Sequence, residues 1–335
     1  MRARGIAPAT LDALRIILIE TGRIDPSARL TALTGGVSSI VARVDDDSAE
    51  PWVAKAPLAQ LAVADEWLVD RRRGASEAAA LELLQGRVGP VEVPRLLFFD
   101  AELTIMGQEM IPGPPPTYKD QLLSGEVRPD VPAALGVAAG ALHRMAPPDA
   151  LATPESWKLF DDLRLNPYYW STAAKRPELR SAFSALIDET VASTPRRLVH
   201  GDLTPKNVLV LTDRVVLVDW EVAHAGDASF DLATLTAHLL LKALRSVVTG
   251  GSALLLDSAR RFWDAYDGPA DRARAVRHTG AVMMARLFGK SLVEYLPAEA
   301  ERARVYDLAR LALGGGLTDI DELADAAYSA NERGR

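Results

Sequence analysis

The chain has 335 residues, 48% hydrophobic and 25% charged, which is ordinary for a soluble globular protein and long enough for two lobes or domains. It contains no cysteine, which excludes disulfides, thiolate metal sites and a cysteine nucleophile and suits a cytoplasmic location. Its formal net charge of −7 lacks the basic footprint of nucleic-acid binding, so we expect no nucleic-acid partner.

The first hundred residues predict a small antiparallel sheet and one main helix, preceded by an N-terminal helix. Residues 10–21 form an amphipathic helix with Thr10 as N-cap, and charged residues interrupt its apolar run too often for a signal peptide. The main helix begins near Ser76, a good N-cap, and ends at Gly86. Strands are expected within 30–44 (two strands joined by Gly35-Gly36), 51–56, 93–99 and 103–106.

Beyond the prolines of residues 111–116 the pattern changes from strands to helices. The most apolar stretch, 232–248, contains His238, Lys242 and Arg245 and predicts a buried helix in place of a membrane span, so we expect no membrane partner. Helical runs are expected at 131–145, 178–192, 231–247, 253–267, 271–297 and 299–313. The expected organisation is an N-terminal lobe (1–110), a linker (111–117) and a helical C-terminal lobe (118–335).

Two acidic residues and one amide follow short β-branched runs between positions 198 and 221. Asn207 lies five residues after Asp202, and Asp219 follows the next strand. Phosphoryl transfer requires a carboxylate that orients and deprotonates a hydroxyl, and hard oxygen ligands that hold Mg²⁺ against a nucleotide. The spacing therefore predicts Asp202 as the catalytic residue and Asn207 and Asp219 as metal ligands. The alternative is a β-hairpin whose turns contain Asp and Asn for conformational reasons.

Candidate nucleotide contacts lie upstream of this motif. Gly35 and Gly36 would let backbone N–H groups approach phosphates, with the Ser38 hydroxyl as a further donor. The surrounding residues do not match the glycine patterns of P-loop or dinucleotide-binding proteins. Glu109 and Ile111, just before the prolines, could offer backbone groups to the edge of a purine base.

Lys55 lies between two alanines in the third predicted strand, where a buried ammonium requires an anionic partner. We expect Lys55 to hold nucleotide phosphates, with a glutamate of the next helix as its partner. Glu77 shares a helix face with two leucines and is preferred over Glu82 and Glu66 for that reason.

Two further polar residues near the motif have structural explanations. We expect the ring of His200 to brace the loop, although its ordinary pKa near neutrality would also suit a general base. Asp231 heads a predicted helix, where its side chain would act as a cap.

Together these residues resemble the aminoglycoside phosphotransferase and choline kinase-like superfamily, the small-molecule kinases of the protein-kinase-like fold. The likeness extends over about 30–313 and is densest at 196–233, with the pattern His-Gly-Asp-x-x-x-x-Asn. The resemblance implies that Asp202 is the catalytic base, that Asn207 and Asp219 bind Mg²⁺, and that Asp231 is structural. Local features also resemble methylthioribose kinase relatives, more weakly.

Two departures from protein kinases affect the expected substrate. Gly201 stands where protein kinases have arginine, and only eleven residues separate Asp219 from Asp231. That is too short for a regulated activation segment, so a protein substrate is not expected.

We therefore predict an α+β, two-lobe protein-kinase-like fold, with a small antiparallel β-sheet lobe that carries one key helix and a larger, mostly helical lobe. The predicted activity is transfer of the γ-phosphoryl group of ATP, with GTP as the alternative nucleotide, to a hydroxyl of a small polar molecule in the presence of Mg²⁺. The protein would be a monomer or a homodimer. A sugar-like or secondary metabolite is the preferred acceptor, and an aminoglycoside or other antibiotic is the runner-up.

The acceptor alternatives depend on residues of the helical lobe. Acidic side chains would attract a cationic aminoglycoside, whereas hydroxyl-matching groups would suit a neutral sugar. The acidic candidates are Asp161, Asp162 and Glu221, and the hydroxyl-matching candidates are Tyr168, Tyr169 and Arg286. Two other classes remain open, a catalytically silent nucleotide-binding regulatory protein and a helical interaction protein whose Asp-rich loops only cap helices.

Overall fold

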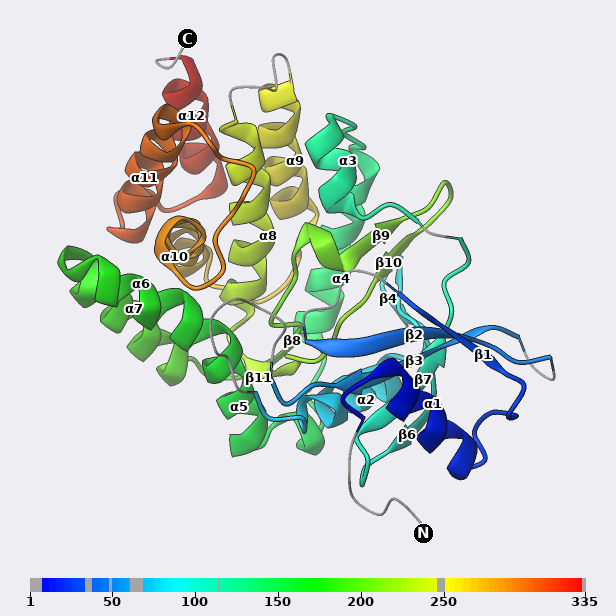
Figure 1. The fold of residues 1–335 in the computed structure, drawn as a ribbon. Coiled ribbons are helices and arrows are strands. Elements are labelled where there is room, and N and C mark those ends of the chain that lie inside the picture. Colours follow the sequence, from blue (N-terminus) through cyan, green and yellow to red (C-terminus); the bar gives the residue numbers. More distant parts are fainter. Residues whose placement is uncertain are drawn as a thin grey trace.

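The computed structural model describes residues 8–33, 38–47, 50–60, 69–113, 115–245 and 251–332. Figure 1 shows a sheet with helices α1 and α2 at the lower right and a bundle containing helices α8 to α12 at the upper left. Short strands β8 and β11 lie near the centre, between these two parts. The arrangement confirms the predicted α+β class. The boundaries at 110 and 117 stay predictions.

The sheet at the lower right is antiparallel and has five strands in the order β1-β2-β3-β7-β6. Strand β3 is central and buried along its whole length, so Lys55 lies on the best-protected strand, opposite Val41 on one side and Met106 on the other. The strands are β1 (Arg29–Ala32), β2 (Ser39–Asp45), β3 (Trp52–Pro57), β6 (Leu96–Asp100) and β7 (Ile105–Glu109).

Helix α1 (Leu11–Glu20) has the N-cap that the sequence predicts, because the Thr10 side chain accepts a hydrogen bond from the Ala13 amide at 3.1 Å. Helix α2 (Arg73–Leu84) begins earlier than predicted, and Ser76 lies within its first turns. The prediction of Ser76 as N-cap is therefore wrong. The first turn of α2 is stabilised by tertiary contacts of the Arg73 guanidinium, which sequence pattern does not reveal.

Two smaller sheets carry the loops of the motif region. One has four strands in the order β4-β5-β10-β9, and the other pairs β11 with β8. The strands are β4 (Arg87–Val88), β5 (Val91–Glu92), β8 (Arg197–Val199), β9 (Val208–Val210), β10 (Val215–Leu217) and β11 (His224–Gly226). The short strands are almost entirely buried, so the loops between them are held from both ends.

Most of the remaining chain is helical. Residues Asp161–Trp170 form a π-helical segment, η2, that was not predicted, and α12 was not predicted either. The helices are α3 (Tyr118–Ser124), α4 (Asp130–Arg144), α5 (Pro154–Phe160), α6 (Ser171–Lys175), α7 (Arg180–Ala192), α8 (Ala228–Ala243), α9 (Gly251–Ala265), α10 (Arg272–Phe288), α11 (Glu299–Leu313) and α12 (Ile320–Glu332).

Helix α10 ends nine residues before the predicted boundary at 297. Gly289 follows it with no room for a side chain, since an added Cβ would lie 2.7 Å from the Ala285 carbonyl oxygen and 3.0 Å from that of Pro167. The next amide, of Lys290, donates to the same Pro167 carbonyl at 3.0 Å. The chain therefore leaves the helix to pack on η2.

Helix α8 is buried at every position, as the sequence predicts for this apolar stretch. Among the described residues, no helix combines the length and the apolar character that a membrane crossing requires.

Candidate active site

The loop between β8 and β9 presents Asp202 next to Asn207. The Asn207 amide nitrogen donates to both the backbone oxygen and the Oδ2 atom of Asp202, each at 2.9 Å. Because both amide protons are used in this way, the carboxamide oxygen of Asn207 is the end left for another ligand. Asp202 is only 2% exposed, so its charge requires compensation from the protein.

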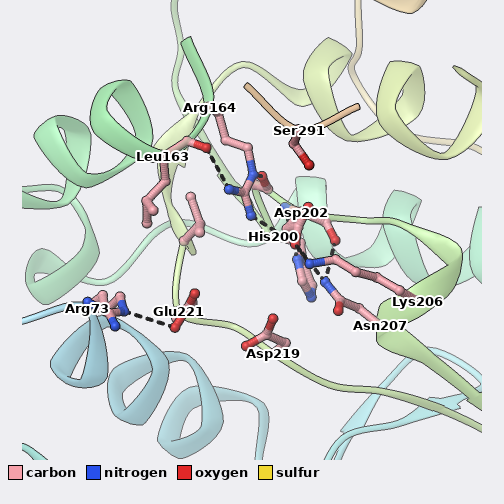
Figure 2. A network of polar contacts seen from close by, with 12 residues as sticks. Arg73, Leu163, Arg164, His200, Asp202, Lys206, Asn207, Asp219, Glu221 and Ser291 are labelled. Carbon is pink, nitrogen blue, oxygen red and sulfur yellow. Dashed lines mark hydrogen bonds and ion pairs between the residues drawn. The ribbon is translucent and has the colours of Figure 1, made fainter. Parts of the chain in front are cut away.

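Two cations supply that compensation. Arg164 of η2 approaches Asp202 Oδ2 at 2.8 Å, and Lys206 approaches the same atom at 2.9 Å. Burial favours the protonated carboxyl, but attraction by Arg164 and Lys206 outweighs it and lowers the pKa of Asp202. Figure 2 shows the Arg164, Lys206 and Asn207 side chains pointing toward Asp202. Asp202 is therefore an ionised carboxylate whose three side-chain contacts all fall on Oδ2.

The ring of His200 braces this loop, as predicted. Its Nδ1 accepts a hydrogen bond from the Asp202 amide at 3.2 Å, and its Nε2 donates to the Val218 carbonyl at 3.2 Å. These partners define a neutral tautomer. Burial lowers the pKa of His200, which favours the neutral form further. With both ring nitrogens in use, His200 has no lone pair to offer as a general base.

Position 201 requires glycine because of its backbone conformation and because other atoms pack closely against it. Its φ is +76°, in the left-handed region, and an added Cβ would lie 2.5 Å from the Val222 carbonyl oxygen. A side chain such as arginine cannot occupy this position without moving the loop.

Gly201→Ala is expected to destabilise the protein by about 1–3 kcal/mol more than Gly315→Ala. Gly315 is a matched control because its φ is +77° and nothing lies within 4 Å of an added Cβ. Urea unfolding of both variants separates the cost of the close contact from the cost of the backbone conformation. Equal losses in the two variants would contradict this account.

Asp231 anchors the loop and does not cap its helix, so the prediction of a capping role is wrong. Its carboxylate accepts hydrogen bonds from the amides of His200 at 2.7 Å and Gly201 at 2.9 Å, and it contacts His143 Nε2 at 3.1 Å. The N-cap of α8 is Asp227, whose side chain accepts from the Ser229 amide at 3.0 Å.

Asp219 follows β10 in an uncommon backbone conformation, with φ at +70°. Its carboxylate Oδ1 lies 2.7 Å from Lys55 Nζ, and its side chain is 24% exposed. The next residue, Trp220, is fully buried and packs on the ring of His200 with centroids 4.4 Å apart. The loop that carries Asp202 and the segment that carries Asp219 therefore pack against each other.

Lys55 joins the sheet to this segment. Its Nζ lies 2.7 Å from Glu77 Oε2 on α2 and 2.7 Å from Asp219. Burial opposes the charged ammonium, but attraction by Asp219 and Glu77 outweighs it and raises the pKa of Lys55. Glu77 is a partner of Lys55, as predicted, and Glu82 is exposed. Glu66 lies outside the described residues.

A second ion pair links helix α2 to the segment that follows β10. Arg73 of α2 is fully buried, and its Nε donates to Glu221 Oε2 at 3.1 Å. One carboxylate oxygen from each of Glu77, Asp219 and Glu221 lies within 4.8 Å of the others. Three carboxylates thus face the two cations Lys55 and Arg73, and such a set of hard oxygen atoms suits a divalent cation.

The remaining predicted nucleotide contacts have mixed outcomes. Gly35 and Gly36 lie outside the described residues. The Ser38 carbonyl accepts from the Leu58 amide at 2.9 Å and from Arg73, and these contacts hold Ser38 in place.

The contact of Glu109 and Ile111 with a purine base stays a prediction, although one of their backbone groups already has a partner. The Glu109 amide already donates to the Arg95 carbonyl at 2.9 Å, and the Glu109 carboxylate lies 3.1 Å from Arg95 Nε. Only the carbonyl of Glu109 could therefore meet a base edge.

Several candidate acceptor residues are already committed to other partners. Tyr169 is fully buried and its hydroxyl lies 2.7 Å from His278 Nδ1, so it cannot match a substrate hydroxyl. Glu221 is paired with Arg73, and Asp162 lies 2.6 Å from Lys158. The acidic attraction that would favour a cationic acceptor is therefore weaker than the sequence indicates.

Three cations of the site were missed by the sequence analysis: Arg73, Arg164 and Lys206. Lys206 lies inside the motif, four residues after Asp202, in a loop and a short 3₁₀ turn for which no helical periodicity predicts the contact. Arg73 is the last of three consecutive arginines, and Arg164 belongs to an unpredicted π-helical segment. Nothing in the local sequence distinguishes these two from surface arginines.

Comparisons with known proteins agree with this geometry. A model of the phosphotransferase enzyme family matches residues 29–274. Methylthioribose kinase of Geobacillus kaustophilus (strain HTA426) is 27% identical over 282 residues, which cover 76% of this chain and 70% of that protein.

Two solved structures share the fold. Plasmodium vivax ethanolamine kinase superposes with a TM-score of 0.53 at 12% identity, covering 97% of this chain and 89% of that one. An amicoumacin kinase in complex with AMP-PNP and Ca²⁺ superposes with a TM-score of 0.54 at 12% identity, covering 91% and 94%. The predicted two-lobe kinase-like fold is confirmed. Because the family model spans well over half of its length, the chain belongs to the phosphotransferase enzyme family.

Proposed function

We propose that this protein transfers the γ-phosphoryl group of ATP to a hydroxyl of a small polar molecule, with Asp202 as the catalytic residue. The observation that supports this most is the buried, ionised carboxylate of Asp202, whose three side-chain contacts share one oxygen atom. The other oxygen, Oδ1, would orient the acceptor hydroxyl. A lowered pKa makes Asp202 a weak base, so the proton would move late and orientation would provide most of its effect.

Lys55, Asn207 and Asp219 would hold the nucleotide side of the reaction. Lys55 would bind phosphate oxygens with Glu77 as its support, and the oxygens of Asn207 and Asp219 would bind Mg²⁺. Mg²⁺, when bound, would neutralise charge on the phosphates. The carboxylate excess around Asp219 fits that cation, and a structural neighbour was solved with AMP-PNP and Ca²⁺.

The phosphates and the base of the nucleotide would be bound by the residues that the sequence predicts for these contacts. Gly35, Gly36 and Ser38 would contact phosphates, and Glu109 and Ile111 would contact the purine through their backbone groups. GTP is the alternative nucleotide.

The acceptor would be a sugar-like or secondary metabolite, with an antibiotic as the runner-up. The pairing of Glu221 with buried Arg73, and of Asp162 with Lys158 at the surface, favours the first of these. A catalytically silent nucleotide-binding protein is disfavoured, because Arg164 and Lys206 hold Asp202 in the charged form that phosphoryl transfer requires.

At a concentration 100 times its dissociation constant, Mg·ATP is expected to stabilise the protein by about 2.7 kcal/mol. This stabilisation is measured as a rise in Tm. Asp219→Asn should abolish most of the magnesium-dependent part of this rise, because it removes a charged ligand next to Lys55. Lys158→Met, which breaks a surface pair, is the control. Transfer of label from [γ-³²P]ATP to a panel of small hydroxyl compounds tests the activity itself. A protein that neither gains stability from Mg·ATP nor transfers label would have another function.

A further inference from the structure

We propose that the phosphate acceptor carries an anionic group, a carboxylate or a phosphate, which is bound by a cluster of cations next to Asp202. This inference rests on the proposed function and names its substrate class. The cluster, called here the basic cluster, comprises residues of η2, α3, α8, α10 and the segment that follows α8. Its members are Lys119, Arg164, Lys242, Arg245 and Arg286.

The basic cluster begins at the catalytic carboxylate. Arg164, which contacts Asp202, and Arg286 of α10 both lie with their guanidinium carbon 6.0 Å from the ring centroid of Tyr168. Arg286 Nη1 donates to the Ser291 hydroxyl at 2.6 Å, and Figure 2 shows Ser291 near Arg164 and Asp202. Arg286 Nε is buried and has no hydrogen-bond partner among the described residues.

Lys242 extends the cluster into the protein. It is fully buried, and its Nζ donates to the His238 carbonyl at 3.1 Å and lies 4.9 Å from the ring centroid of Tyr295. Arg245 lies over the same ring at 5.8 Å. Among the described residues, no carboxylate lies within ion-pair distance of Lys242. The buried hydroxyl of Tyr295 has no hydrogen-bond partner among these residues.

The cations of the cluster repel one another strongly enough to affect ionisation. Burial lowers the pKa of Lys242 to about 7, and repulsion by Arg286, Lys119 and Arg245 adds to this shift. His238 is affected in the same way, since burial and then Lys242, Arg286 and Lys206 lower its pKa. Arg164, a member of the basic cluster, lies 2.8 Å from Asp202 Oδ2, so the cluster reaches the catalytic carboxylate.

Among the residues that the structure describes, too few anions face the basic cluster. Glu294 is paired with Lys119 at 3.3 Å but is 75% exposed, and Asp202 is already shared by Arg164 and Lys206. The whole chain has a net charge of −7, so this excess of positive charge is a local departure from its composition. A buried cation without a counterion is unfavourable, and bound anions relieve that cost. The site therefore suits an anionic acceptor and opposes a cationic aminoglycoside.

The first test compares matched hydroxyl compounds that differ in charge. Glycerate and glycerol, gluconate and glucose, and ribose 5-phosphate and ribose serve as pairs, with kanamycin as the cationic member. We expect kcat/KM for the anionic member of at least one pair to exceed that of its neutral counterpart about 10- to 100-fold. Preference for a hydroxy acid or for a sugar phosphate then identifies the anion. Equal or better use of neutral compounds or kanamycin would overturn the inference while leaving the proposed function intact.

Two variants test the cluster itself. Arg286→Gln and Lys242→Met should each raise KM for the anionic acceptor about tenfold or more with kcat changed less than threefold. Lys242→Met should also raise the Tm of the free protein, because an unpaired buried cation is replaced by an apolar side chain of similar length. Arg261→Gln, which breaks a surface pair with Asp257, is the control. An unchanged KM, or a lower Tm for Lys242→Met, would contradict the assignment.

A binding measurement makes the inference independent of finding the acceptor. With the nucleotide site saturated by Mg·AMP-PNP, inorganic phosphate should raise the Tm of the wild type and of Arg261→Gln. It should have a smaller effect on Arg286→Gln and Lys242→Met. The same response in all four proteins would show that the cluster binds no anion and would reject the inference.

Discussion

Asp202→Asn is expected to lower kcat by about 10³-fold while Mg·ATP still raises the Tm of the variant. The substitution keeps the shape of the side chain but removes the charge that, in the proposed mechanism, would orient the acceptor hydroxyl and take its proton. Of the proposed ligands of the nucleotide side, Lys55 and Asp219 form a separate cluster, and Asn207 keeps its hydrogen bond to the backbone oxygen of residue 202. Single-turnover transfer of label from ATP, with Tm measured in parallel, separates the loss of chemistry from the loss of binding.

The control for this prediction is Asp257→Asn on the exposed face of α9, where the carboxylate pairs with Arg261 at 2.6 Å. It should retain wild-type turnover, since surface pairs of this kind contribute little. Asp202→Asn also leaves Arg164 without its anion, so some loss of stability is expected. Turnover close to the wild-type value in a folded Asp202→Asn protein would refute the catalytic assignment.

Asp231→Ala is expected to lower the free energy of unfolding by about 3–5 kcal/mol. The change leaves two buried amides, of His200 and Gly201, without an acceptor and removes one of the two hydrogen-bond partners of His143. Because these amides fix the loop before Asp202, kcat should fall as well, although Asp231 contacts neither reactant. Urea unfolding at neutral pH measures the loss, and Asp257→Ala should change stability by less than about 0.5 kcal/mol.

The same carboxylate predicts a dependence of stability on pH. Burial acts to raise the pKa of Asp231, but the hydrogen bond and charge of His143 outweigh burial, and the folded-state pKa lies below its ordinary value. The unfolded chain therefore takes up this proton first as the pH falls below about 4. The contribution of Asp231 is complete above that range and is lost as the pH falls through the folded-state pKa. The difference in stability between wild type and Asp231→Ala should shrink there, and a constant difference would contradict the linkage.

The sequence predicted the elements whose signals are local. Thr10 as N-cap and the buried α8 follow from residues that are neighbours along the chain. Glu77 was distinguished from Glu82 by helical periodicity alone, and the ion pair with Lys55 confirms the choice. Ser76 was assigned wrongly because the start of α2 depends on Arg73, whose guanidinium meets the carbonyl of Leu58 and the carboxylate of Glu221. Those partners are distant in sequence, so no local pattern contains them.

The reaction class follows from the sequence alone. Asp202, Asn207 and Asp219 lie at the ends of short strands at a fixed spacing, and that spacing is a property of the chain. The charge that surrounds them depends on how the chain folds. Arg164, Lys242 and Arg286 come from three separate elements, and each is unremarkable in its own segment. Coulomb interactions depend on distance in space and on burial, and neither periodicity nor spacing records these quantities. The cationic surroundings of Asp202 therefore form only when the helices pack together.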